Sequence, residues 1–171
     1  MWQASNAAFT ATTTNGAQSF STGSVAISDN DGGSGVLFTV SGLKPGSTGT
    51  ACITVSYTGS LAAGVRLYGT SPSTTNSLSS YVLLQIDETT GSGTITYPSC
   101  TGFGASTTLF NSTLASFGSA KTSYATGLSS WNPGGSATRD YRFTYTLDSA
   151  APNTTMSSSA AITFVWEAQN T

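Results

Sequence analysis

The chain of 171 residues offers few side chains that could carry out chemistry: seven acidic residues, five basic residues, two cysteines and no histidine. Without histidine, Ser-His-Asp and Cys-His catalysis cannot be built, and zinc sites that use histidine are excluded. Five cations cannot form the basic stripe that neutralises nucleic-acid phosphates, so we expect no nucleic-acid partner. The composition also predicts no metal site and no cofactor.

Carboxylates are the remaining candidates for catalysis. Asp87 and Glu88 are adjacent, so on a strand they point to opposite faces and cannot act as a pair. Asp140, Asp148 and Glu167 lie in separate segments, and we expect structural or solvent-facing roles for them. We therefore predict no catalytic residue and no enzymatic activity.

Two short patterns could bind a ligand or carry a modification. Asp29, Asn30 and Asp31 precede two glycines, but the later glutamate of an EF-hand loop is missing, which favours a hairpin turn over a calcium site. Asn111 and Asn153 each match the acceptor pattern for N-linked glycosylation. Such matches arise readily by chance in a chain this rich in serine and threonine.

Cys52 and Cys100 are the two cysteines of the chain. Because a Ser/Thr-rich, Lys-poor chain is typical of secreted proteins, the favoured interpretation is one disulfide formed in an oxidising compartment. Two buried free thiols are the alternative. A catalytic thiol is disfavoured because the chain has no histidine to activate it.

The elements that must position these residues are short strands separated by turns, which is typical of an all-β sandwich. A polar loop is expected over residues 70–80, and alternating apolar residues predict that Tyr141, Phe143 and Trp166 face the core. The predicted strands lie within residues 2–13, 20–27, 36–40, 51–57, 65–67, 81–86, 95–100, 141–147 and 162–167. No run of apolar residues approaches the length of a membrane span, so no membrane partner is expected for the mature chain.

One segment has a different period. Leu109, Phe110, Leu114 and Phe117 are spaced as one face of a helix, with the N-cap expected at residue 106 or 107. The sequence therefore predicts a single short helix inserted between strands.

Several segments together resemble the TasA/camelysin family of secreted fibre proteins. The run Gly-Leu-Lys-Pro-Gly at residues 42–46 and the Thr-Gly-Ser-Leu-Ala run at 58–62 are similar to a family pattern of the form LxPGD followed by VxNxGsL. Ser47 departs from it, because the family often has an acidic residue there. Further similar segments are residues 6–11, 20–25, 141–148 and 161–169.

This resemblance implies a jelly-roll-like two-sheet sandwich that is exported, loses its signal peptide and assembles with identical subunits into fibres at the cell surface or in a biofilm matrix. Residues 1–13 would be the strand that one subunit donates to the next, and residues 14–171 a single sandwich domain. An open sheet edge favours such an added strand on physical grounds as well. The residues expected to seat the donor strand are Trp2, Ala4, Ala7, Phe9 and Ala11.

Two alternatives remain. The N-terminal strand could pair within its own domain, as most strands do. The protein could also be a monomeric secreted module that binds carbohydrate or another surface, with Trp131 beside Asn-Pro-Gly as its exposed aromatic residue. Low net charge is compatible with self-association and favours the fibre.

Overall fold

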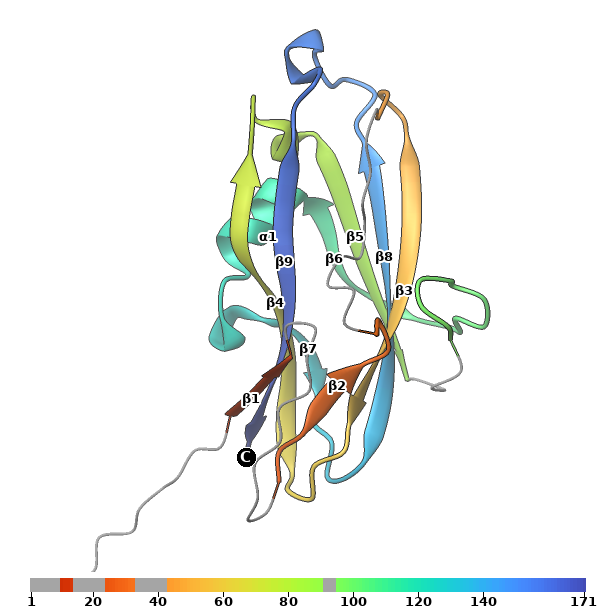
Figure 1. The fold of residues 1–171 in the computed structure, drawn as a ribbon, viewed down its shortest axis with the longest axis vertical. Helices are drawn as coiled ribbons and strands as arrows, with labels where there is room; N and C mark the ends of the chain where they lie inside the picture. The colour runs from red at the N-terminus through yellow and green to blue at the C-terminus, as the bar shows by residue number, and fades with distance from the viewer. Residues whose placement is uncertain (1–9, 14–23, 33–42, 91–94) are drawn as a thin grey trace, which may run out of the picture.

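The computed structural model describes residues 10–13, 24–32, 43–90 and 95–171, which form two facing antiparallel sheets (Figure 1). In sheet A the strand order is β1-β9-β4-β7, and in sheet B it is β2-β3-β8-β5-β6. Sheet A consists of β1 (Thr10–Thr13), β4 (Ala63–Thr74), β7 (Leu128–Trp131) and β9 (Ala160–Asn170). Sheet B consists of β2 (Ile27–Asp29), β3 (Thr48–Tyr57), β5 (Val82–Thr90), β6 (Thr107–Thr113) and β8 (Ala137–Leu147).

Among the described strands, two consecutive pairs lie within sheet B, β2 with β3 and β5 with β6, and every other connection crosses from one sheet to the other. Connections that cross between two facing sheets are a feature of jelly rolls. The predicted all-β two-sheet sandwich with a jelly-roll-like arrangement is therefore confirmed.

Alternating side chains of β3, β8 and β9 fill the core between the sheets, as their apolar spacing predicts. Ile53, Tyr141, Phe143 and Trp166 are almost fully buried. The rings of Phe143 and Trp166 meet edge to face with their centroids 5.9 Å apart, which joins sheet B to sheet A. Because β8 and β9 are both interior strands of their sheets, this contact helps to fix the position of the two sheets relative to each other.

The predicted inserted helix is present, but it is shorter and begins later than expected. Helix α1 spans Leu114–Ala120, and its N-cap is Thr113, whose hydroxyl accepts a hydrogen bond from the Ser116 amide at 3.1 Å. Leu109 and Phe110 belong instead to β6, which pairs with β5. The prediction of an N-cap at residue 106 or 107 was wrong because sheet pairing determines the backbone there.

The helical spacing that misled this prediction has a physical origin. Phe110 on β6 and Phe117 on α1 pack edge to face with ring centroids 5.2 Å apart. Two residues that meet across a strand-to-helix corner thus mimic two residues on one helical face.

Two further predictions about segments were wrong. Strand β4 continues to Thr74, although a loop was expected from residue 70, because after a β-bulge Ser73 and Thr74 pair with Ala161 and Ala160 of β9. Cys100 was expected in a strand, but residues 95–106 form turns and irregular chain.

The remaining described elements are short 3₁₀ turns at Leu78–Ser80 (η1), Tyr124–Thr126 (η2) and Asn153–Thr155 (η3). Within the described residues, no helix is long and apolar enough to cross a membrane. The strand predicted over residues 36–40 lies outside the described residues. Of the strand predicted over residues 20–27, the structure describes residues 24–27, of which only Ile27 belongs to a strand, as the first residue of β2.

Candidate strand-acceptor site

The acidic residues occupy separate places, and each has its own hydrogen-bond partners. Asp140 accepts a hydrogen bond from the Thr54 hydroxyl at 2.7 Å, and Asp148 accepts one from the backbone amide of Ala150. Within the described chain, no group of three or more His, Cys, Asp or Glu side chains could hold a metal ion. Asp31 donates its backbone amide to the Asp29 carboxylate, which is the turn geometry that the sequence favours.

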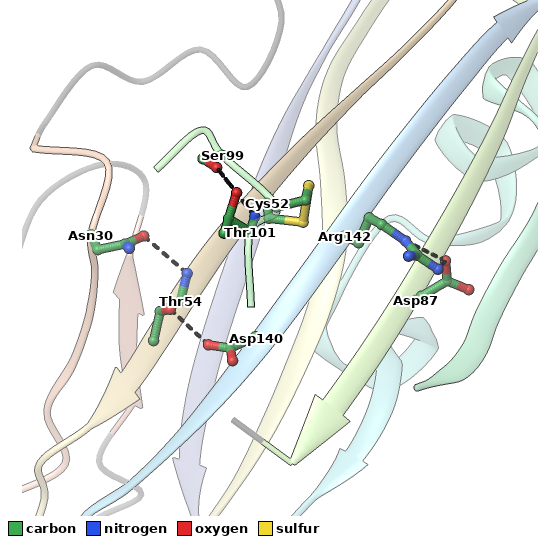
Figure 2. Close-up of a disulfide and its surroundings, with 9 residues drawn as sticks. Asn30, Cys52, Thr54, Asp87, Ser99, Thr101, Asp140 and Arg142 are labelled. Carbon is green, nitrogen blue, oxygen red and sulfur yellow. Dashed lines mark hydrogen bonds and ion pairs between the residues drawn. A yellow bond between two sulfur atoms is a disulfide. The ribbon is translucent and has the colours of Figure 1, made fainter. Parts of the chain in front are cut away.

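Asp87 and Glu88 point to opposite faces of β5, as their adjacency predicts. Asp87 lies on the outer face of sheet B, 1% exposed, with the Arg142 guanidinium 2.8 Å away (Figure 2). Glu88 points inward and accepts hydrogen bonds from Ser129 at 2.6 Å and Tyr141 at 2.9 Å. Burial, and then the charge of Glu88, raise the pKa of Tyr141 well above its ordinary value. Asp87 therefore links neighbouring strands of sheet B, and Glu88 links sheet B to Ser129 of β7 in sheet A.

The environment of Asp87 predicts a specific acid dependence of stability. Burial alone would raise its pKa, but hydrogen bonds from Thr108, Gln85 and Arg142 outweigh this effect and lower the pKa below its ordinary value. Its ionised form therefore stabilises the fold above the pKa of an unfolded aspartate, about 4, and this contribution is lost as the pH falls through the lower folded pKa.

We expect Asp87→Asn to flatten the fall of unfolding free energy between about pH 5 and about pH 2, because the substituted side chain cannot titrate. Urea denaturation of both proteins across this range measures the difference. Equal acid dependence in the two proteins would contradict the expectation.

Glu167 faces away from the core and is only 9% exposed, so of the two predicted roles, structural and solvent-facing, it has the structural one. Its carboxylate accepts hydrogen bonds from the Tyr68 hydroxyl and the Gln169 amide, both at 2.7 Å. Burial and this carboxylate raise the pKa of Tyr68 to about 12. Val165, on the same side of β9, is also buried.

The predicted disulfide joins Cys52 of β3 to Cys100, with 5.0 Å between the Cα atoms (Figure 2). It attaches the irregular segment 95–104 to the outer side of sheet B. The Cys52 amide donates to the Pro98 carbonyl at 3.0 Å, and Asn30 donates its side-chain amide to the Ile95 carbonyl. The segment thus takes the place of a neighbouring strand along part of β3.

Trp131 does not lie where the carbohydrate-binding alternative needs it. It ends β7, is 4% exposed, and packs in the core with the Arg139 guanidinium 5.9 Å from its ring centroid. The expectation of an exposed aromatic residue at this position was wrong because the pairing of β7 with β4 turns the indole inward. Asn111 on β6 and Asn153 in η3 are both exposed.

A groove of about 1000 Å³ lies between the two sheets, where β9 faces β3, β8 and β5. Its rim includes Lys44 and side chains of the connection from β8 to β9, between residues 151 and 159. This connection lies at one end of the sandwich (Figure 1). Its interior is mainly apolar and is lined by Leu43, Ile53, Leu84, Leu147, Ile162 and Phe164, among others. Sequence reasoning missed this site because its lining comes from segments that are distant along the chain.

Strand β9 offers an incomplete edge beside this groove. β4 pairs with nearly all of β9, whereas β1 pairs only with residues 166–169, from Thr13 opposite Trp166 to Thr10 opposite Gln169. Among the described residues, no strand pairs with residues 160–165 on that side. Among the described residues, about 20 Å of this edge therefore has no pairing strand and could accept an added one.

Trp166 marks the point where the paired and open parts of β9 meet. It lines the groove, is 2% exposed, and its indole N–H is the buried side-chain polar atom that lacks a partner in the described part of the chain. A buried donor without an acceptor is costly and rare in native structures. An occupant that brings a carbonyl or hydroxyl oxygen would remove this cost.

Of the residues predicted to seat the donor strand, Ala11 lies in β1 opposite Ala168 of the same chain. Trp2, Ala4, Ala7 and Phe9 lie outside the described residues. The structure therefore shows the end of the N-terminal segment paired within its own domain, at the end of β9 opposite the groove rim (Figure 1).

Searches against models of protein families and against curated proteins found no match, so the resemblance to the TasA/camelysin family stays a prediction.

Proposed function

We propose that this protein is a structural subunit of an extracellular fibre of the biofilm-matrix type. The N-terminal segment of one copy would complete the sandwich of the next, so that identical subunits join head to tail. The observation that carries this proposal is the apolar groove beside the open edge of β9. An open strand edge supplies backbone hydrogen bonds, and a neighbouring apolar groove supplies side-chain burial, which are the two requirements of strand addition.

The placement of the two ends supports a polymer over a closed dimer. Thr10 lies opposite Gln169, where β9 ends, and the groove rim lies where β9 begins. A segment attached at one end of the sandwich and a groove that opens at the other form a heterologous contact, which propagates. If residues 1–9 were extended as a strand, they would span about 30 Å, which exceeds the roughly 20 Å of β9 that no described strand pairs with.

The low net charge and the disulfide are compatible with this function. The net charge is -2 and charged residues make up 7% of the chain, so copies repel one another weakly. The disulfide is compatible with an extracellular location. The alternative, a monomeric carbohydrate-binding module that uses Trp131, is not favoured because that side chain is buried.

Electron microscopy of the purified full chain tests the proposal, and Ile162→Glu sharpens the test. Ile162 lines the groove, so a carboxylate there would be buried without a partner by an incoming strand, and we expect filaments to be lost. Leu83→Glu is the matched control, because Leu83 is 39% exposed on the outer face of sheet B and filaments should persist.

Circular dichroism must show that both variants are folded. A full chain that stays monomeric at all concentrations would contradict the proposal. So would Ile162→Glu filaments as abundant as those of the parent.

A further inference from the structure

The outer face of sheet B is divided into a covered half and an open half. Segment 95–104, attached through the disulfide, lies over the half that contains Cys52, Asp87 and Asp140, all of them buried. Phe103 of this segment places its ring 4.8 Å from the Arg142 guanidinium. The covered half therefore ends at a raised edge, which we call the step, formed by Phe103 of this segment and Arg142 of β8. Beyond the step lies the half of the outer face that this segment does not cover.

The open half is a floor formed by two rows of side chains across four neighbouring strands. Register places the first row as Thr48, Thr146, Leu83 and Thr113, and the second as Thr50, Thr144, Gln85 and Asn111. None of these eight side chains is charged, and four strands span about 14 Å. We call the floor together with the step the sheet-B shelf.

Hydrogen-bonding groups on the sheet-B shelf are oriented but incompletely used. Gln85 donates its amide nitrogen to both Asp87 carboxylate oxygens at 3.0 Å, which leaves its amide oxygen free among the described residues. Arg142 uses Nε and Nη2 on Asp87 and leaves Nη1 without a partner there. The Asn111 amide beside them, on the edge strand β6, is exposed. Because Asp87 holds Gln85 and Arg142, the free groups of these two side chains lose little side-chain entropy when they bind a ligand.

We propose that the sheet-B shelf binds a neutral polysaccharide. Sugar hydroxyls both donate and accept, and the shelf offers them the Gln85 amide oxygen, the exposed Asn111 amide, the Thr50 and Thr144 hydroxyls and one guanidinium N–H of Arg142. Asp87 neutralises the charge of Arg142, so the shelf has no excess positive charge to select an anionic polymer. The ring of Phe103 and the exposed Leu83 provide apolar surface for the C–H faces of a sugar.

The site is distinct from the groove between the sheets, so its occupation does not depend on fibre assembly. Binding of the full chain, produced without N-glycosylation, to immobilised xylan, β-1,3-glucan, galactomannan and anionic polygalacturonate tests it by biolayer interferometry. We expect at least one neutral polymer to bind and polygalacturonate to bind more weakly.

The double variant Thr144→Val/Asn111→Ala removes two of the floor groups while keeping the sheet uncharged. We expect its affinity for that neutral polymer to fall by about tenfold or more, since each lost hydrogen bond weakens binding severalfold. The matched control, Thr58→Val/Asn153→Ala, changes the same residue types at exposed positions elsewhere and should bind within about twofold of the parent.

Three results would overturn the proposal: no binding to any neutral polymer, tighter binding to polygalacturonate, or equal losses in the double variant and its control. Filament formation by the same samples in electron microscopy reports on the fibre separately, so the failure of one proposal does not affect the other.

Discussion

A chain that lacks residues 1–9 is expected to fold as a monomer and to form no filaments at any concentration. The deletion removes the segment proposed to enter the groove of the next subunit, while it keeps β1, which pairs with residues 166–169 of its own chain. Because the interaction is head to tail, loss of one of its two surfaces in every copy stops propagation completely. Size-exclusion chromatography with light scattering and electron microscopy measure the outcome.

A mixing experiment provides the control for this deletion. The truncated chain keeps its groove, so a synthetic peptide of residues 1–13 should bind it and raise its melting temperature, as any ligand specific to the folded state does. The same peptide should bind truncated Ile162→Glu more weakly, because that variant places a charge in the groove. Normal filaments from the truncated chain would contradict strand donation and leave the groove without its proposed occupant.

Loss of the disulfide is expected to lower the free energy of unfolding by about 4 kcal/mol. Cys52 and Cys100 are 48 residues apart, and closing a loop of this length restricts the unfolded chain by that amount in the chain-entropy model. Urea denaturation of the oxidised protein, the reduced protein and the Cys52→Ala/Cys100→Ala variant measures the loss.

The reduced protein and the double variant should agree with each other if the cross-link itself is responsible. Both should also unfold with a steeper dependence on urea, because an unfolded chain without the cross-link exposes more surface. A loss below about 1 kcal/mol in both would contradict the expected stabilisation by the cross-link.

The strands that sequence reasoning predicted well are those with alternating side chains between two neighbours. In β8, Tyr141 and Phe143 face the core and Arg142 faces outward, because sheet pairing preserves the two-residue period along the strand. The turn around Pro45 likewise depends on local chemistry: Gly46 has a φ of 85°, in the left-handed region that glycine favours.

Predictions failed where a distant segment determined the local structure. Leu109 and Phe110 have helical spacing with Phe117, but pairing with β5 makes their segment a strand. Thr74 has no apolar neighbours to suggest a strand, yet it pairs with Ala160, 86 positions later along the chain. Hydrogen bonds between strands come from partners that a local sequence window does not contain.

The sequence by itself determined that this protein has few chemical groups, an all-β fold and two cysteines suited to a disulfide, because composition and side-chain period are local properties. Only the tertiary structure decided where the groove, the open edge of β9 and the sheet-B shelf lie. Each of these sites is formed by side chains from strands that are distant in sequence, and their positions depend on the order in which the strands pair. Pairing order follows from the packing of the whole core, so it cannot be inferred from any one segment.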